Sequence, residues 1–358
     1  MFDSVIMKCS PVILILLLFC ISGGAHAAKT PSESWTFAFR FENDLFADTD
    51  RFYTNGIKLN WVSPDLEWFQ ELPWLQRDAP LQNAINKGIR HLPFSDKKAR
   101  QRHVSFSLGQ MMYTPTDPQA TQVILDDRPY AGWLYGSAAF HSKSYKRLDT
   151  FELQAGFTGD WSLAQEAQDL IHSIRNIEKA RGWDNQIDTE LAVALIYDHK
   201  HRYIPDIDFT RKWGMDAISS IGAAAGNAFT HVSAGFEVRA GWNLPADFGS
   251  SLIRPGGETN APADRADPRY QNKFKSFSFH LFAAVSGRAV LHNIFLDGNT
   301  FSDSHSVSKE TFVGDFVLGA SVSYRRLKIA YSHVLRTKEF KRQPDSQKFG
   351  SISISYTY

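Results

Sequence analysis

The chain has 358 residues and a formal net charge of +1, with 39 Lys and Arg almost balanced by 38 Asp and Glu. Because the basic residues are dispersed along the sequence, a nucleic-acid-binding protein is disfavoured. No segment after the N-terminal region approaches the length of uncharged sequence that a transmembrane helix needs. Two classes remain: a soluble exported protein, or a membrane barrel whose lipid-facing residues alternate with interior ones.

The first 27 residues have the pattern of a secretory signal peptide. An apolar run over 11–21, interrupted only by Cys20, precedes the small-residue segment Ala-His-Ala at 25–27. Residues 28–358 would then form the mature protein as a single domain. The only other cysteine, Cys9, also lies in the leader, so we expect no disulfide, thiolate metal site or cysteine nucleophile in the exported chain.

The first predicted strand, 35–43, alternates strictly between aromatic and small or charged residues. Its aromatic side chains share one face, and Arg40 and Glu42 lie on the other. This alternation is typical of a strand between lipid and a wet interior. One polar cluster ends the strand at Asp44, and a second cluster around Thr54 follows as the chain turns back.

Similar alternation recurs along the chain and predicts twelve strands. Their spans are 35–43, 52–63, 102–113, 130–142, 148–160, 186–202, 209–224, 229–243, 272–289, 310–324, 326–337 and 347–358. A soluble β-sandwich alternates as well. The export signal, the aromatic-rich face and the final strand with its terminal aromatic Tyr358 favour a barrel, and an even strand number suits one. The predicted fold is therefore all-β, a twelve-stranded antiparallel transmembrane β-barrel.

One segment, 162–181, departs from the alternation and predicts a short helix in an extracellular loop. Apolar residues from Leu163 to Ile177 recur at helical spacing. A polar stripe that includes Gln168 and His172 lies on another face. We expect the helix to lie across the barrel mouth, with the apolar stripe packed and the polar stripe facing a cleft.

Strand parity predicts where the polar residues meet. If both termini are periplasmic, the turns after the first, third and fifth strands lie together at the exterior rim. These turns carry Asn43 with Asp44, the 114–130 loop and the predicted helix. The same topology puts two long connections, 64–100 and 244–271, in the periplasm, where turns are usually short, and their role stays open.

The polar groups at this rim suit ester hydrolysis assisted by a hard cation. Asp44 with neighbouring oxygens could hold Ca²⁺, which prefers oxygen ligands and would polarise an ester carbonyl. Asn43 could donate a hydrogen bond to the oxyanion, and His172 could take a proton from water as general base. Asp44 is also compatible with an ordinary turn residue, and His172 with a solvated helix face. The sequence contains no serine-hydrolase elbow, zinc helix or phosphate loop.

Three sequence blocks resemble the lipid A deacylase family of Gram-negative outer membranes. The blocks are FENDLF…TDRFYTNGIKL (41–59), LGQMMYTPTD…DDRPYAGWLYGS (108–137) and Q…H…GWDNQI…E (168–190). The resemblance implies a twelve-stranded barrel that removes the 3′-acyloxyacyl group of lipid A in a Ca²⁺-dependent reaction. By position it implies that Asn43 and Asp44 form the essential Asn-Asp pair, that Thr54 supplies the active-site hydroxyl and that His172 is the catalytic histidine.

One departure concerns the second block. The loop after the Tyr-Thr-Pro at 113–115 has no Lys or Arg before Arg128, where some family members have a lysine near the sugar-acid headgroup. Preference among lipid A variants is therefore open. The run Asp126-Asp127-Arg128 is equally compatible with a local ion pair that steadies the loop and with a ligand role.

The leading hypothesis is thus an outer-membrane lipid A 3′-O-deacylase, with lipid A or lipopolysaccharide as substrate, Ca²⁺ as cofactor and outer-membrane lipids as surroundings. We expect a monomer and no nucleic-acid partner. Two alternatives stay open. One is a non-catalytic pore or surface-binding barrel, and the other is a phospholipid acyl hydrolase. A pore would be lined by the interior polar residues Arg40, Glu42, Lys58, Glu237 and Arg239.

Overall fold

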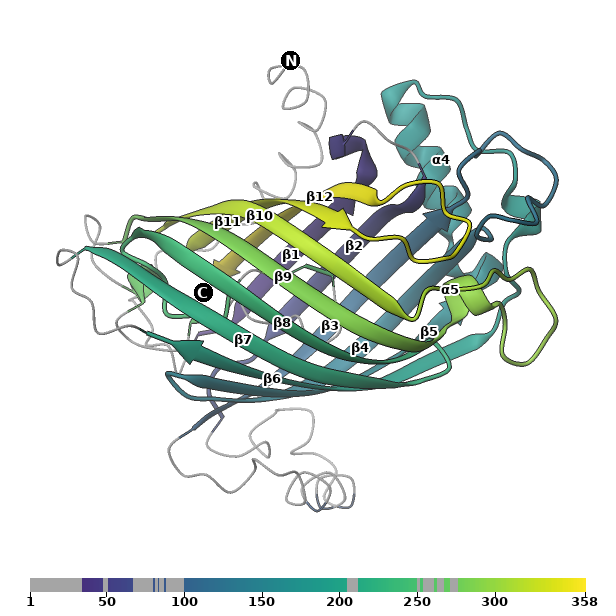
Figure 1. Cartoon of the computed structure of the whole chain (residues 1–358). Coiled ribbons are helices and arrows are strands. Elements are labelled where there is room, and N and C mark those ends of the chain that lie inside the picture. The colour runs from purple at the N-terminus through teal and green to yellow at the C-terminus, as the bar shows by residue number, and fades with distance from the viewer. Residues whose placement is uncertain are drawn as a thin grey trace.

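The structure is a computed structural model of the chain, and it describes residues 34–47, 51–66, 80, 83, 87, 100–204, 212–249, 252–253, 261–262, 267–270 and 276–358. The expected signal peptide, 1–27, lies outside the described residues. Twelve antiparallel strands close into a barrel in which β12 pairs with β1 (Figure 1). The strands are β1 (Thr36–Asn43), β2 (Phe52–Val62), β3 (Gln101–Thr114), β4 (Ala131–Lys143), β5 (Arg147–Thr158), β6 (Leu191–Tyr203), β7 (Trp213–Gly226), β8 (Phe229–Trp242), β9 (Ser278–Asn293), β10 (Phe312–Tyr324), β11 (Leu327–Arg336) and β12 (Gln347–Thr357). The predicted fold class is confirmed.

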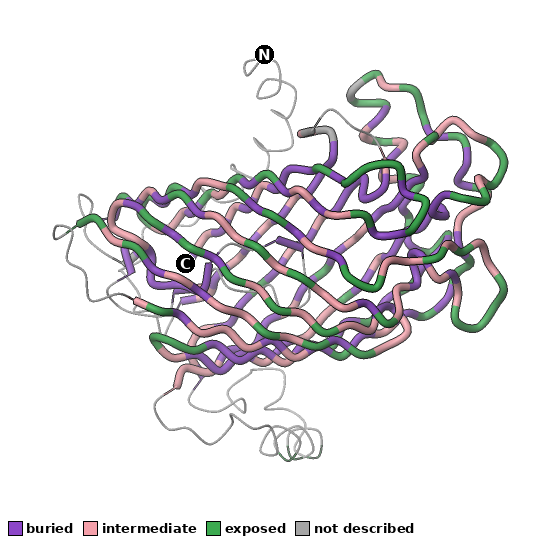
Figure 2. The backbone as a smooth tube through the Cα atoms, viewed as in Figure 1, coloured by how far each residue is buried: buried purple, intermediate pink, exposed green. Residues whose placement is uncertain are grey.

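Alternation along the strands separates an inward row of side chains from an outward row. In β1, Arg40 and Glu42 are fully buried, whereas the intervening aromatic residues are only partly covered. Figure 2 shows this alternation of burial around the barrel. Inward charges pair across the lumen, as Lys58 of β2 does with Glu152 of β5 at 3.4 Å. The polar side of each strand therefore lines the interior, as the sequence predicts.

The two ends of the barrel differ. The loops that follow β1, β5 and β9 carry the helical segments η2 (Asp44–Ala47), η5 (Gly159–Ser162), α4 (Ala164–Arg175), η6 (Trp183–Asn185) and α5 (Ile294–Asp297). We call this the helical end. Strand β1 begins and β12 finishes at the opposite end, which we call the terminal end (Figure 1). No helix among the described residues is long and apolar enough to span a membrane.

The connection between β8 and β9 carries a buried ion cluster. Asp247 accepts hydrogen bonds from Arg239 of β8 at 2.5 Å, from Lys328 of β11 at 2.6 Å and from Arg269 at 3.1 Å. Arg269 lies in η7 (Pro268–Tyr270) of the same connection. Burial by itself would raise the pKa of the Asp247 carboxyl, but these cations hold that pKa well below its usual range. The cluster therefore remains ionised and ties the connection to two strands.

Further contacts put the described part of this connection inside the barrel. The backbone N–H of Ile253 donates to Glu42 of β1 at 2.7 Å. Lys143 of β4 donates to the carbonyl of Pro262 at 2.9 Å. Because β1, β4, β8 and β11 are spread around the barrel, a segment that bonds to all four lies in the lumen. This gives a physical role to the long 244–271 connection, whereas most of 64–100 lies outside the described residues.

Strand β6 begins later than its alternation predicts, at Leu191 rather than 186. The predicted starts of β7 at 209 and of β9 at 272 lie outside the described residues. The residues before β6 form loop contacts instead of a ladder. For example, the side chain of Glu190 accepts backbone N–H groups from Thr300 at 2.9 Å and Phe301 at 3.3 Å. Alternation in sequence thus extends beyond the hydrogen-bonded strand.

Candidate active site

Three residues on the outward face of the barrel are buried although lipid-facing positions elsewhere are exposed. Asn43 follows the outward Phe41 by two residues in β1, yet it is only 4% exposed. Asn43 pairs in register with Asn55 of β2, which pairs with Met112 of β3, and both partners are buried. Another part of the chain therefore covers the outer wall at the helical end of β1–β3.

Helix α4 covers the part of this wall that β3 and β4 form. Ala164, at its first turn, packs in one buried cluster with Met112. Gln110, on the outer face of β3, donates to the carbonyl of Ser162 at 2.7 Å. A side chain at Gly132 would place its Cβ 2.0 Å from the Ser162 hydroxyl oxygen, so only glycine lets the helix start approach β4. The helix therefore lies against the outer wall, and its predicted position across the mouth is wrong.

The apolar stripe of α4 is also not packed as the sequence analysis predicts. Leu163 is 51% exposed, Leu170 61% and Ile174 55%. In contrast, Gln168 and His172 of the polar stripe are buried. The helix thus turns polar groups towards the wall. Helical periodicity defines the two faces but does not state which of them meets protein.

A bulge in β2 positions Thr54. The pairing of β2 with β3 shifts register between Tyr53 and Asn55, which leaves Thr54 as the extra residue. Its hydroxyl oxygen lies 2.7 Å from that of Thr114 on β3, and both threonines are buried. The hydroxyl group of Thr54 is therefore held against the wall beside the buried row.

Asp44 directly follows Asn43 at the start of η2. It is fully buried, and its Oδ2 accepts the backbone N–H of Arg51 at 2.6 Å, which fixes the carboxylate across the first hairpin. Asn55 Oδ1 is buried and has no hydrogen-bond partner among the described residues. Within the described ranges, no three His, Cys, Asp or Glu side chains gather as a metal site. A cation here would rely on the Asp44 carboxylate with amide and hydroxyl oxygens, and that donor set fits Ca²⁺.

His172 is buried on α4, and a backbone carbonyl fixes its tautomer. Its Nδ1 lies 2.7 Å from the carbonyl oxygen of Glu178. Because a carbonyl only accepts, Nδ1 carries the proton, and Nε2 holds the lone pair of the neutral ring. The helix ends at Arg175, because Asn176 adopts the left-handed conformation with φ 56°. The chain then folds back and brings Glu178 to the ring, so the predicted helix to residue 181 is too long.

Gln168 lies one turn before His172 on the same face, and the sequence analysis does not assign it to the site. Its Oε1 accepts the indole N–H of Trp183 at 2.7 Å, which fixes the orientation of the amide. Its Nε2 is buried and has no hydrogen-bond partner among the described residues. The spacing of four residues from His172 was the available signal. The amide nitrogen is a donor suited to an incoming carbonyl oxygen.

The four predicted site residues thus share one end of the barrel. Asn43, Asp44 and Thr54 belong to the first hairpin, which turns at the helical end. His172 lies on α4, which packs on the outer face of the neighbouring strands β3 and β4 at the same end. This convergence at one end agrees with strand parity, but the shared surface is the outer wall rather than the rim.

The loop residues around Arg128 form contacts other than the local ion pair that the sequence analysis left open beside a ligand role. Asp127 accepts two backbone N–H groups, from Thr116 at 2.6 Å and from Arg128 at 2.8 Å. The guanidinium of Arg128 instead pairs with Glu339 at 3.1 Å and lies 4.4 Å from the ring centre of Tyr113. Asp127 therefore steadies the loop through main-chain bonds, and Arg128 ties it to the loop after β11.

A second contact joins the loop of α4 to that of α5. Glu190, just before β6, accepts the side-chain amide of Asn299 at 3.1 Å in addition to two backbone N–H groups. Burial tends to raise the pKa of this carboxyl, but the hydrogen bonds prevail and lower it. The ionised carboxylate thus links two loops of the helical end.

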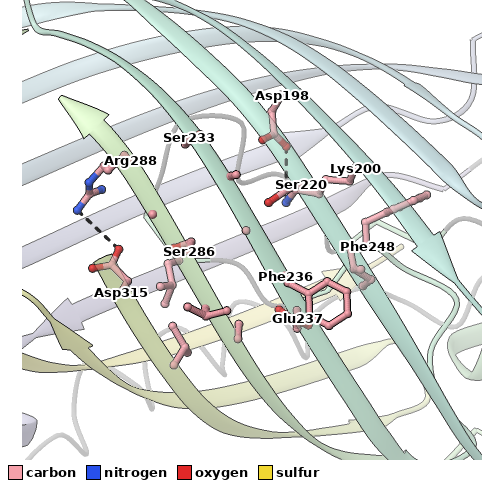
Figure 3. A pocket seen from close by; sticks show the side chains of 18 of the residues that line it. Asp198, Lys200, Ser220, Ser233, Phe236, Glu237, Phe248, Ser286, Arg288 and Asp315 are labelled. Carbon is pink, nitrogen blue, oxygen red and sulfur yellow. Dashed lines mark ion pairs between the residues drawn. The ribbon is translucent and has the colours of Figure 1, made fainter. Parts of the chain in front are cut away.

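The lumen contains a separate cavity of about 130 Å³. Figure 3 shows its ion pairs, Asp198 with Lys200 at 3.9 Å and Arg288 with Asp315 at 3.6 Å. Phe248 of the luminal connection also lines it. Its lining comes mainly from β6 to β10, whereas the buried residues of the candidate active site lie on the outer face of β1 to β3 and on α4. The cavity and the candidate active site are therefore different places.

Comparison with known proteins agrees with the architecture. The sequence profile of a family described as "Outer membrane protein LpxR" matches residues 12–358. A comparison with curated proteins gives no match. Among solved structures, LpxR from Salmonella typhimurium is similar, with a TM-score of 0.69, 18% identity, and coverage of 90% of this chain and 99% of that one. The β domain of the Bordetella autotransporter BrkA has a TM-score of 0.39 and 8% identity, with coverage of 90% and 98%.

Proposed function

The chain belongs to the LpxR family of outer membrane proteins, the lipid A deacylase family that its motifs resemble, and we propose that it hydrolyses the 3′-acyloxyacyl ester of lipid A. It lies in the outer membrane of a Gram-negative bacterium as a closed barrel. In this proposal the terminal end faces the periplasm and the helical end faces the outside, so that α4 lies at the level of the outer leaflet.

The observation that carries this proposal is that polar side chains are buried on the outer face of β1 and β2 and on the wall-facing side of α4. A lumenal enzyme would present its polar groups to the interior, but Asn43, Thr54 and His172 lie on or against the outward face. A lipid in the outer leaflet can approach such a surface laterally without leaving the membrane. Polar groups buried at a lipid-facing wall suit a substrate whose ester lies just below a headgroup.

His172 is the proposed general base. The Glu178 carbonyl fixes the proton on Nδ1, which leaves Nε2 to take a proton from the attacking water. The indole of Trp183 holds Gln168 one turn away, so the Gln168 amide nitrogen and the Asn43 amide are the donors proposed for the developing oxyanion. Thr54, fixed by its contact with Thr114, orients the substrate at the wall.

Asp44 is the proposed residue for Ca²⁺, with the buried amide oxygen of Asn55 as a further donor. When bound, the cation supplies positive charge that polarises the ester carbonyl. The Arg51 N–H keeps one carboxylate oxygen of Asp44 in place across the hairpin. The residues themselves thus supply a carboxylate and amide oxygens, a donor set in which Ca²⁺ is favoured over softer metals.

The test is mass spectrometry of lipid A and phospholipids from cells that express the protein, with a His172→Ala strain as the matched control. We expect lipid A to lose the mass of its acyloxyacyl group only in the unaltered strain. Loss of single chains from phospholipids would support the phospholipase alternative instead. Unchanged lipids, with the barrel folded in the membrane, would refute the hydrolase.

Calcium has a test that does not depend on turnover. The thermal midpoint of the purified barrel should rise with added Ca²⁺ and fall in excess chelator, because a ligand that binds only the folded state stabilises it. Asp44→Asn should remove the response. A midpoint that is independent of Ca²⁺, together with full activity in chelator, would remove the cation from the proposal.

One observation bears on the pore alternative. The described part of the β8–β9 connection lies in the lumen and bonds to strands on several sides of the barrel. An open pore needs a clear passage through the lumen. The ion cluster around Asp247 holds this connection in the lumen, which favours an obstructed lumen over an open pore. A function on the outer wall is compatible with such a lumen.

A further inference from the structure

Helix α4 presents three distinct faces. The first meets the barrel wall and consists of Ala164, Gln168 and His172, all buried. The second is polar and exposed, with Gln165, Glu166 and Ser173. An ordinary surface helix needs only these two faces. The third is exposed and apolar, and nothing in the hydrolytic proposal uses it.

The third face is a continuous stripe. Ala167, Leu170 and Ile174 follow at spacings of three and four residues, which places them on one side of the helix, and Leu163 precedes them at the N-cap. Three of them are more than half exposed, and Trp161, just before the helix, is 63% exposed. Leu163 has a φ of 53°, a conformation that a leucine rarely adopts, and its side chain is nonetheless exposed.

This stripe continues the lipid-facing surface of the barrel. The Trp161 ring contacts that of Phe157 on the outward face of β5, with 5.0 Å between the ring centres and a tilt of 65°. Phe157 pairs in register with Leu191 of β6, which is also exposed and outward. Gln110 fixes the helix start to the wall beside this surface. The exposed apolar surface of β5 and β6 therefore extends to Trp161, two residues before Leu163 at the start of the stripe.

We propose that α4 is an interfacial helix whose apolar stripe, with Trp161, inserts among the acyl chains of the outer leaflet. The polar face with Gln165 and Ser173 then lies in the headgroup layer, and the third face stays on the wall. A helix with these three surroundings needs apolar, polar and wall-facing sectors in this order, and an aromatic side chain suits the lipid interface. The occupant of the stripe is lipid, because the surface that it extends is the lipid-facing wall.

This inference goes beyond hydrolysis and explains how a lipid could meet a covered site. The residues under α4 are buried from water, so an ester that reaches them has to pass the edge of the helix. If the stripe lies within the acyl layer, the lipid passes this edge while its chains remain in an apolar environment. The helix is then part of the membrane surface rather than a lid above it.

The experiment measures the depth of α4 in a bilayer. Cys9 and Cys20 are replaced by Ser, and single cysteines are introduced as Leu170→Cys, Ile174→Cys and, as matched controls on the polar face, Gln165→Cys and Ser173→Cys. Each is labelled with an environment-sensitive dye. The full barrel is reconstituted in phosphatidylcholine vesicles that contain a doxyl-labelled lipid quencher, and iodide serves as the aqueous quencher.

We expect dyes at 170 and 174 to emit at shorter wavelength and to be quenched by the doxyl lipid several-fold more than dyes at 165 and 173. Iodide should give the reverse order. Equal exposure of all four dyes to iodide would overturn the proposal. Protection of 170 and 174 from both quenchers would also overturn it, because a second protein copy would then cover the stripe. None of these readouts depends on hydrolysis, so this inference and the proposed function fail separately.

Discussion

The most informative perturbation is His172→Ala, because one residue carries both a structural bond and the proposed proton transfer. The structural bond joins Nδ1 to the Glu178 carbonyl at 2.7 Å. Its loss removes this hydrogen bond from the Glu178 carbonyl, just after α4, and costs about 1 kcal/mol of stability. A barrel closed by twelve strand pairings should tolerate that loss and remain folded.

The catalytic loss should be much larger. General base catalysis contributes ~10²–10⁴-fold, or about 3–5 kcal/mol of transition-state stabilisation. We therefore expect kcat for lipid A deacylation to fall by roughly that factor with little change in KM, since the imidazole acts on water rather than on the lipid. Added imidazole should restore part of the rate, because the substitution leaves space at the ring position.

The assay is the rate of acyloxyacyl release by purified protein, followed by mass spectrometry, with folding checked by the heat-modifiable gel mobility of the barrel. Ser173→Ala is the matched control. Ser173 is next to His172 in the helix, and its hydroxyl donates to the Asp169 carbonyl at 2.7 Å. A folded His172→Ala protein with a near-normal rate would refute the assigned base.

Three other predictions follow from contacts around the barrel. Thr54→Ala should lower kcat by about tenfold, the rate equivalent of one ~1.4 kcal/mol hydrogen bond. Thr54→Ser should retain activity because it keeps the hydroxyl beside Thr114. Equal rates in both variants would contradict a role of the hydroxyl group in orienting the substrate. Asp247→Ala should remove the buried carboxylate that Arg239, Lys328 and Arg269 share and cost about 3–5 kcal/mol, so the lumen should open and conductance in planar bilayers should rise above that of the unaltered barrel. A variant without conductance would count against the idea that this cluster holds the β8–β9 connection in the lumen. The pKa of Glu190 is lowered by its hydrogen bonds, so its stabilisation is present above the ordinary carboxyl pKa and is lost as pH falls through the lowered value. Glu190→Gln should therefore reduce the acid dependence of the thermal midpoint, and an unchanged dependence would exclude this carboxyl.

The strand architecture was predictable because it depends on local alternation. Phe37, Phe39 and Phe41 are stable only on the lipid-facing side, and Arg40 and Glu42 only on the polar interior side. Each strand can therefore adopt only one orientation in the barrel wall. Strand ends were less predictable. Before β6 the alternation continues, but loop contacts to Glu190 replace the ladder.

The candidate site was predictable only in part. Sequence placed Asn43 and His172 at one end of the barrel, because strand parity decides which turns meet. It did not place them on the outer wall, since that depends on α4 packing beside Gly132, a contact between segments distant in sequence. For Gln168 the sequence offered only its spacing of four residues from His172, and the bond to Trp183 that fixes its amide depends on the tertiary structure.

The amino-acid sequence by itself determined the strands, their inward and outward faces and the end at which the polar turns gather, since these follow from a period of two and from even strand number. Tertiary structure alone decided which face of α4 meets the wall, because helical periodicity distinguishes the faces of a helix but does not determine what each face packs against. It also decided that the β8–β9 connection lies in the lumen, because Asp247 finds its cations on strands that are far apart in sequence.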